Sequence, residues 1–252
     1  MPDYKTDREI EMMREAGRIV AEVLDLLGGH IAPGVTTAEL DTMAEDYIRS
    51  RGADPAFKGY RMGNNTFPAS ICASIDDVVV HGIPSKRRLV DGEIISIDVG
   101  TCKDGYFGDG ARTYPVGNVS EVKRKLMDVT LQALEAGIEQ AVVGNHLGDI
   151  SAAVQTVVEQ NGFSVVRDMV GHGIGRRMHE DPQVHNFGTP GTGPVLKKGL
   201  VLAIEPMVNA GDYKIVFKPD GWTTITADGS PSAHFEHTVA ITEHGPDVLT
   251  LV

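Results

Sequence analysis

Residues 95–117 read ISIDVGTCKDGYFGDGARTYPVG, a pattern typical of two β-strands joined by a tight turn. The Asp104-Gly105 pair favours a two-residue loop of type I′, because both central residues of that loop adopt positive φ. The register that follows from this turn pairs Gly100 with Asp109 and Asp98 with Ala111. Asp98 and Asp109 are therefore predicted to be diagonal neighbours on one face of the hairpin, roughly 5–8 Å apart.

Two carboxylates at this distance repel each other, and the strand that carries Asp98 also contains Ile94, Ile95 and Ile97, which predict burial. Burial of ionised carboxylates costs on the order of several kcal/mol unless a cation or hydrogen-bond donors compensate them. Two interpretations are open at this point. The aspartates are either exposed carboxylates at a sheet edge or one half of a metal site.

Length and composition limit the class of protein. The chain has 252 residues, of which 41% are hydrophobic, enough to build a sizeable core. Its formal net charge of −12 argues against broad nucleic-acid binding, so no DNA partner is expected. The chain shows no apolar run typical of a signal peptide or a membrane span, and its two cysteines form no CxxC pair. We therefore expect a globular, cytoplasmic, monomeric protein without a membrane partner.

Apolar periodicity predicts two helices followed by strands, and then the same order again. The first two helices are expected over residues 7–27 and 37–51, the second starting at a capping box of Thr36 with Glu39. Strands are expected near residues 70–80, 93–99 and 106–116. The second round has helices over about 120–138 and 147–160, then strands near 163–166, 200–205, 213–218, 222–226 and 236–242.

A shift of 110 residues aligns the second helices of the two rounds, for example Gly34 with Gly144, Leu40 with Ile150 and Gly52 with Gly162. This similarity supports an internal duplication. The sequence therefore predicts an α+β fold with two pseudo-twofold halves, in which helices cover one side of a curved sheet. No linker rich in Pro or Ser divides the chain, so residues 1–252 are expected to form a single domain.

Further polar residues stand in apolar or glycine-rich surroundings. His172 lies between glycines in GHGIG, which we expect to form a backbone turn that presents the imidazole. Glu205 ends the apolar stretch LVLAIE, and Glu236 lies within SAHFEHTVAIT. Each residue alone fits an ordinary surface or loop position. Together with the two aspartates, however, they form an oxygen-rich ligand set suited to two divalent transition ions, which would also explain why the aspartates tolerate each other.

The same residues carry a resemblance to a known family. The ordered set Asp98, Asp109, His172, Glu205 and Glu236, within IDVGTCKDGYFGD, GHGIGRRMHE, AIEP and FEHT, resembles the metal-binding pattern of the methionine aminopeptidases. HGIP at residues 81–84 makes the bacterial type I enzymes the most similar group. The resemblance extends over about residues 6–250. It implies the pita-bread (creatinase/aminopeptidase) fold, with duplicated halves and a curved antiparallel sheet.

The resemblance also implies an activity and a cofactor. The protein is expected to use two divalent ions, Co, Mn, Fe or Zn, to remove the N-terminal methionine of nascent proteins when the second residue is small. Asp98 would bind one ion and His172 the other, with Asp109 and Glu236 shared between them. Glu205 would be both a ligand and the proton shuttle.

Substrate contacts follow from the same comparison. His179 would donate a hydrogen bond to the scissile carbonyl, and His81 would position the substrate and assist the departing amine. The methionine pocket would be lined by Phe67, Cys72 and Trp222. Three departures from the family pattern concern the shape of this pocket: a long segment at residues 59–72, Asp76 in place of asparagine, and Met178 in place of an aromatic residue.

Contact with the ribosome is a further expectation, through the basic residues at 86–88 or 123–125. Two other functions stay open. One is a prolidase or Xaa-Pro aminopeptidase, although those relatives carry an additional N-terminal domain for which this chain has no room. The other is a non-enzymatic binding protein on the same fold, of the kind that has lost its ligands, whereas all five ligands are present here.

Overall fold

A computed structural model describes residues 2–252 of the chain. Met1, the first residue of the predicted domain, lies outside the described residues. The described part contains four helices: α1 (Asp7–Gly28), α2 (Thr37–Ser50), α3 (Glu121–Glu139) and α4 (Leu147–Gln160). Within residues 2–252, no helix combines the length and the apolar character that crossing a membrane requires.

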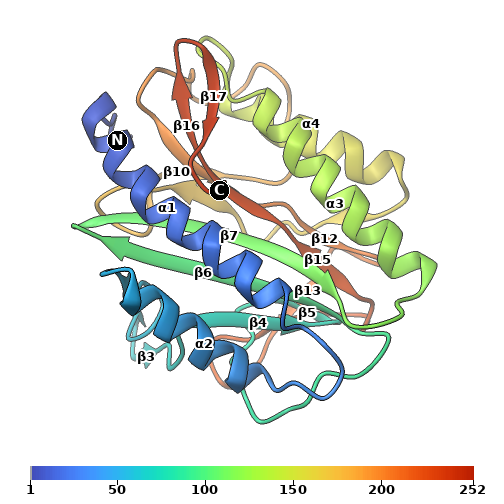
Figure 1. Cartoon of the computed structure of the whole chain (residues 1–252). Helices are drawn as coiled ribbons and strands as arrows, with labels where there is room; N and C mark the ends of the chain where they lie inside the picture. The colour runs from blue at the N-terminus through green and yellow to red at the C-terminus, as the bar shows by residue number, and fades with distance from the viewer. Residues whose placement is uncertain (1) are drawn as a thin grey trace.

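A nine-stranded sheet forms the centre of the molecule (Figure 1). Its strands are β1 (Asp54–Pro55), β4 (Ile71–Ile75), β6 (Ile94–Lys103), β7 (Tyr106–Pro115), β9 (Gly171–Gly173), β10 (Glu180–Val184), β11 (Val201–Ile204), β16 (Glu236–Thr242) and β17 (Gly245–Val248). The order is β1-β6-β7-β16-β11-β9-β10, with β4 paired to β6 and β17 to β16, and all these pairs are antiparallel.

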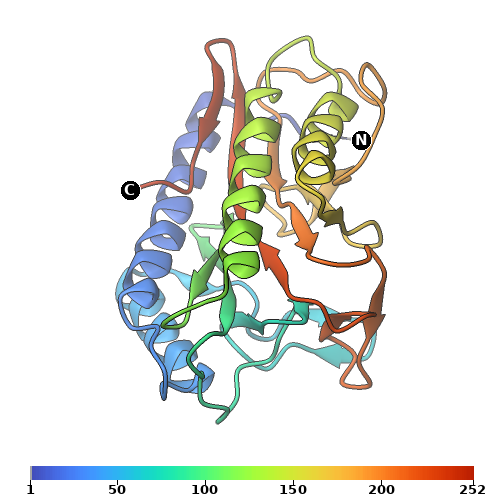
Figure 2. The ribbon, with the colours of Figure 1, turned by 90° about the vertical axis from the view of Figure 1, so that its right-hand side faces the viewer.

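Smaller sheets extend this framework. One sheet contains β8 (Ser164–Val165), β12 (Met207–Asn209) and β15 (Ser232–His234). A second contains β5 (Val78–Val80), β13 (Ile215–Phe217) and β14 (Thr224–Thr226), and a third pairs β2 (Arg61–Met62) with β3 (Asn65–Thr66). In both ribbon views the long helices α1 and α3 lie along the outside of the strands (Figures 1 and 2). The predicted α+β fold, a curved antiparallel sheet covered by helices, is confirmed.

The β6–β7 hairpin has the predicted register. Asp98 pairs with Ala111 and Gly100 pairs with Asp109. Both turn residues adopt positive φ, 51° at Asp104 and 79° at Gly105, as a type I′ loop requires. The local turn chemistry therefore placed the two aspartates on one face of the hairpin.

Helix α1 fixes this hairpin from its outer side. A Cβ at Gly108 would lie 2.7 Å from the backbone nitrogen of Gly17, so the helix and β7 can approach this closely only at glycine. The hydroxyl of Thr101 donates a hydrogen bond to the carbonyl oxygen of Ala16 at 2.9 Å. The strands that carry the aspartates are thus held by packing on the opposite face of the hairpin, because side chains alternate between the two faces of a strand.

The two halves repeat each other closely. Both bounds of α4 are those of α2 displaced by 110 residues. The N–H of Thr36 donates to Glu39 at 2.7 Å, and the N–H of His146 donates to Asp149 at 2.6 Å, so both helices begin in the same way. One apolar core lies beneath α1 and α2 and a second beneath α3 and α4. The predicted duplication is confirmed.

Two local expectations were wrong. The strand expected over residues 70–80 is divided into β4 and β5 by a turn at Asp76, whose φ is 49°. His172 lies in strand β9 rather than in a turn. The glycines beside it serve close packing, because a Cβ at Gly171 or Gly173 would collide with a backbone carbonyl oxygen of a neighbouring strand.

Candidate active site

Five neighbouring strands bring the predicted metal ligands together. Asp98 comes from β6, Asp109 from β7, His172 from β9 and Glu236 from the first residue of β16, while Glu205 directly follows β11. These five residues, here named the floor, lie at the bottom of a cavity of about 240 Å³. Since β6, β7, β16, β11 and β9 are consecutive in the sheet, residues distant in the sequence reach one point.

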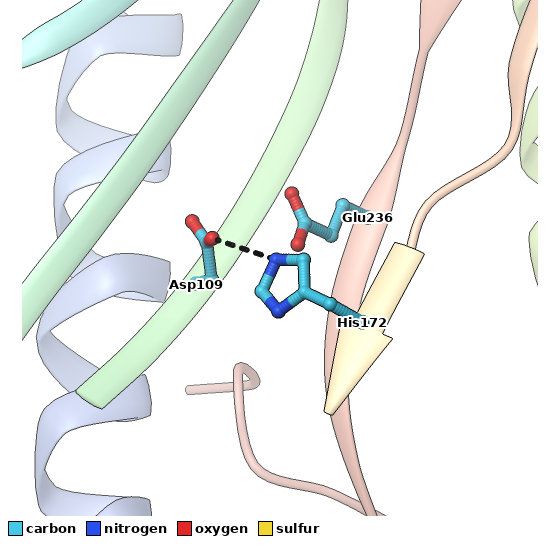
Figure 3. Close-up of side chains that lie close together, drawn as sticks. All are labelled: Asp109, His172 and Glu236. Atoms are coloured by element: carbon cyan, nitrogen blue, oxygen red, sulfur yellow. Dashed lines mark ion pairs between the residues drawn. The ribbon is translucent and has the colours of Figure 1, made fainter. Parts of the chain in front are cut away.

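His172 lies next to three carboxylates of the floor, those of Asp109, Glu205 and Glu236. Its Nε2 is 3.8 Å from Oδ2 of Asp109 and 3.6 Å from Oε1 of Glu205, and Figure 3 shows the Asp109 and Glu236 carboxylates beside its ring. Its Nδ1 lies 2.9 Å from the carbonyl oxygen of Gly173. A carbonyl oxygen accepts hydrogen bonds only, so Nδ1 carries the proton and the lone pair of Nε2 faces the carboxylates. Burial lowers the pKa of His172 to about 3, which keeps the imidazole neutral.

The floor carboxylates have an unusual environment for acidic groups. Burial, and then the charge of Glu205, raise the pKa of Asp98 to about 7. Burial likewise raises the pKa values of Asp109, Glu205 and Glu236 well above their ordinary range. Within the described chain, Oδ1 of Asp98, Oδ1 of Asp109 and Oε1 of Glu236 are buried without a hydrogen-bond partner. Unpaired buried carboxylate oxygens beside a neutral imidazole fit divalent cations as the missing partner.

One histidine of this cluster was missed in the sequence. His234, at the end of β15, is only 2% exposed, and its Nε2 has no hydrogen-bond partner among residues 2–252. This nitrogen is 3.6 Å from Oε2 of Glu205 and 3.9 Å from Oε2 of Glu236. Burial lowers its pKa. The signal was present in the sequence HFE, because residues two apart in an extended chain point to the same side.

The rest of the cavity is largely apolar. Its lining above the floor consists of Phe57, Tyr60, Met62, Phe67, Cys72, His81, His179 and Trp222. The rings of Phe67 and Trp222 meet edge to face, with centroids 5.2 Å apart and an interplanar angle of 79°. All the residues expected to contact substrate therefore lie in one cavity. Phe57, Tyr60 and Met62 were not predicted.

His81 and His179 stand at different places in this cavity. His81 adopts a φ of 60°, which is uncommon for a residue other than glycine, and its ring lies edge to face with that of Trp222, with centroids 6.4 Å apart. Burial, and then the charges of His234 and His179, lower its pKa to about 4. The ring of His179 is 4.3 Å from that of His172. His179 is exposed in the cavity, yet the protein packed around it lowers its pKa.

The three departures from the family pattern lie in different surroundings. The long segment at residues 59–72 contains the exposed β2–β3 hairpin, from which Met62 reaches the cavity. The carboxylate of Asp76 accepts a hydrogen bond from the N–H of Ile94 at 3.0 Å, outside the cavity. Met178 is buried and packs toward Gly100 without lining the cavity. Of the three, only the long segment supplies residues to the cavity lining.

Known proteins share both the sequence and the fold. Residues 11–243 match the description of metallopeptidase family M24. The chain is 54% identical to the methionine aminopeptidase of Clostridium perfringens and to methionine aminopeptidase 1 of Bacillus subtilis, each over 248 residues and 98% of both chains. The crystal structure of methionine aminopeptidase from Rickettsia prowazekii superimposes with a TM-score of 0.97 at 44% identity, covering 100% of both chains.

A prolidase shares the fold less completely. For the prolidase from Pyrococcus furiosus the TM-score is 0.80 at 25% identity, and the match covers 99% of this chain and 65% of the prolidase. Similarity to the methionine aminopeptidases is higher in identity, in superposition and in the share of the relative that is covered. The chain therefore belongs to metallopeptidase family M24 and, within that family, to the methionine aminopeptidases.

Proposed function

We propose that this protein removes the N-terminal methionine from peptides and nascent proteins whose second residue is small. One observation carries the proposal. A single cavity joins the floor, three of whose carboxylates have a buried oxygen without a partner among residues 2–252, to an apolar wall formed by Phe67, Cys72 and Trp222. The floor suits a hydrolytic metal centre, and the wall suits a methionine side chain. Membership in the methionine aminopeptidases supports the same assignment.

We assign the metal ligands to the five floor residues. Asp98 would hold one divalent ion and His172 the other, Asp109 and Glu236 would be shared, and Glu205 would complete the set. Ions held by these residues would lower the pKa of a bound water and supply positive charge to stabilise the developing oxyanion. The carboxylate and imidazole donors suit Mn, Fe, Co or Zn.

Glu205 is the proposed proton shuttle. Its carboxylate lines the cavity and lies between two imidazoles, with Oε1 at 3.6 Å from His172 and Oε2 at 3.6 Å from His234. From this position it can take the proton of the attacking water and return it to the departing amine.

The two cavity histidines are the proposed substrate contacts. His179, beside the floor, would donate an N–H hydrogen bond to the scissile carbonyl and to the oxyanion that forms from it. His81, beside Trp222, would position the substrate and assist the departing amine. The lowered pKa of each imidazole keeps it neutral, so each offers one N–H and one lone pair.

The cavity also accounts for specificity. Phe67, Cys72 and Trp222 offer apolar and polarizable surface to the methionine thioether. When the methionine side chain of the substrate packs against this wall, the second residue of the substrate lies against the floor. A large side chain on that residue would move the scissile carbonyl out of line with His179. Small second residues are therefore preferred.

A peptide panel tests this function. The metal-loaded protein should cleave Met-Gly-Ser, Met-Ala-Ser and Met-Ser-Ser, cleave Met-Leu-Ser and Met-Lys-Ser poorly, and leave Leu-Ala-Ser intact. A chelator should abolish the activity, and added metal should restore it. Preferential cleavage of Xaa-Pro peptides would support the prolidase alternative instead. Binding of peptide without cleavage by any metal-loaded form would support the non-enzymatic alternative.

We also propose that residues 1–252 act as one catalytic domain and that the protein is a monomer in the cytoplasm. A further proposal is that the protein binds the ribosome transiently. The exposed Lys86 and Arg124 belong to the two basic clusters and are the candidate contacts. Co-sedimentation with ribosomes should decrease as salt rises, because such contacts are screened. Absence of binding even at low salt would contradict the ribosome contact.

A further inference from the structure

Tyr60 contacts the proposed carbonyl donor directly. Its hydroxyl oxygen lies 2.8 Å from Nδ1 of His179, a normal hydrogen-bond distance. The two ring centroids are 5.3 Å apart with an interplanar angle of 58°, so the rings do not stack. The contact between these side chains is therefore the hydrogen bond itself.

Two proton arrangements are compatible with this distance. Either the tyrosine O–H donates to the lone pair of Nδ1, or an Nδ1–H donates to the tyrosine oxygen. In the second arrangement the tyrosine O–H would have to donate to solvent, because within residues 2–252 its oxygen contacts no hydrogen-bonding group other than His179. The first arrangement uses the tyrosine proton and leaves the N–H of His179 on Nε2.

We infer that Tyr60 is a positioning residue, whose hydroxyl donates to Nδ1 of His179 and thereby fixes the N–H of that imidazole on Nε2. The inference rests on the proposed function, in which His179 must offer an N–H to the scissile carbonyl. With Nδ1 occupied by the tyrosine proton, Nε2 is the only nitrogen of the ring that can do so.

The backbone around Tyr60 is suited to this task. The N–H of Tyr60 donates to the carbonyl oxygen of Phe57 at 2.9 Å, and the N–H of Phe67 donates to the carbonyl oxygen of Tyr60 at 2.8 Å. Gly59 closes the same ladder with a 2.9 Å bond to Phe67. Tyr60 therefore sits at the base of the β2–β3 hairpin, where its backbone is fixed on both sides.

Two neighbouring histidines are thus held in opposite tautomers. Nδ1 of His172 donates to the carbonyl oxygen of Gly173, which leaves Nε2 as a lone pair for a metal ion. Nδ1 of His179 accepts from Tyr60, which leaves Nε2 as an N–H donor. The rings are only 4.3 Å apart, so the partner at Nδ1, rather than the general surroundings, distinguishes their roles.

Nitrogen NMR of the Zn²⁺-loaded protein, labelled with ¹⁵N in its histidines, reads the tautomers directly. We expect the directly bonded proton on Nδ1 for His172 and on Nε2 for His179. A proton on Nδ1 of His179 would overturn the inference. This readout needs no variant and no activity, so it is independent of whether the proposed function is correct.

Kinetics of Tyr60→Phe provide the second arm. Loss of the hydrogen bond should lower kcat for Met-Ala-Ser about three- to tenfold, with KM changed less than twofold and a mixture of His179 tautomers. Tyr47→Phe is the matched control, because that hydroxyl bonds to Glu22 at 3.2 Å between α1 and α2. A raised KM with unchanged kcat and tautomer would show that Tyr60 only lines the pocket.

His179→Ala separates the two claims. A fall in its kcat supports the donor role that the proposed function gives to His179. If kcat stays unchanged while wild-type His179 carries its proton on Nε2, the proposed donor role fails although the tautomer assignment stands.

Discussion

The floor and the apolar wall of the cavity differ in whether their side chains find partners within the protein. Buried oxygens of Asp98, Asp109 and Glu236 lack partners within the described chain, whereas Phe67 and Trp222 are packed against each other and their neighbours. The floor is therefore incomplete without bound cations, while the wall is a finished apolar surface. This difference predicts that changes in the floor remove chemistry and that changes in the wall alter substrate binding.

Asp109→Ala should have the largest effect. It removes a proposed shared ligand, so the variant should lose metal and at least about a thousandfold in kcat/KM, since the metal supplies several kcal/mol of transition-state stabilisation. Metal analysis after dialysis and the peptide assay measure both quantities. Asp128→Ala, at an exposed position on α3, is the control. Full metal content and full activity in Asp109→Ala would show that the floor is not the metal site on which activity depends.

Glu205→Gln tests whether the floor does more than bind metal. An amide oxygen can still coordinate an ion but cannot carry a proton, so kcat should fall about 10²- to 10⁴-fold at metal occupancy matched to wild type. Glu135→Gln on the exposed side of α3 is the matched control. An unchanged kcat at matched occupancy would exclude Glu205 as the shuttle.

His234→Gln tests whether this histidine supports metal binding by the floor carboxylates. The imidazole lies within 3.9 Å of oxygens of Glu205 and Glu236, so its loss should weaken metal binding about 10- to 100-fold, as expected when a partner of ligating carboxylates is removed. Calorimetric titration with Zn²⁺ or Mn²⁺ measures the affinity. His237→Gln is the control, because that ring bonds to Thr250 at 2.7 Å instead. Wild-type affinity in His234→Gln would assign His234 to packing alone.

Trp222→Phe tests the wall. The smaller ring removes apolar contact with the methionine side chain equally in ground and transition states, so KM should rise about three- to tenfold with little change in kcat. Metal content should not change. Steady-state kinetics on Met-Ala-Ser provides the measurement, and a fall in kcat at constant KM would contradict the separation of wall from floor.

Glu9→Gln, far from the cavity, should have the smallest effect and act on stability. Hydrogen bonds from the Thr6 N–H, the Thr6 hydroxyl and the Tyr106 hydroxyl lower the pKa of Glu9 from 4.5 to about 2. A carboxyl whose pKa is lowered in the folded state stabilises fully above pH 4.5 and loses this contribution as pH falls toward 2.

Urea unfolding measures the effect of this variant. The wild type should be about 1 kcal/mol more stable than Glu9→Gln at pH 7, and the difference should shrink below pH 4.5. Glu15→Gln, exposed on the same helix, is the control. A difference that does not change with pH would show that the charge of Glu9 has no part in the cap.

Much of the scaffold could be predicted because its rules are local. The Asp104-Gly105 turn set the register of the hairpin, and the Thr36–Glu39 capping box placed the start of α2. The order of five acidic and imidazole residues was sufficient for the family resemblance. Strand divisions and short strands were less predictable, because close packing between strands, as at Gly171, leaves no periodic pattern in the sequence.

The sequence by itself determined the helices, the hairpin, the duplication and the identity of the five floor residues, since each depends on turn chemistry, periodicity or ordered motifs. The tertiary structure alone decided that His234 lies beside Glu205, that Tyr60 contacts His179, and that His172 is part of a strand. These facts depend on which side chains meet across strands that are far apart in the chain. Such meetings follow from three-dimensional packing, and no local preference of a residue encodes them.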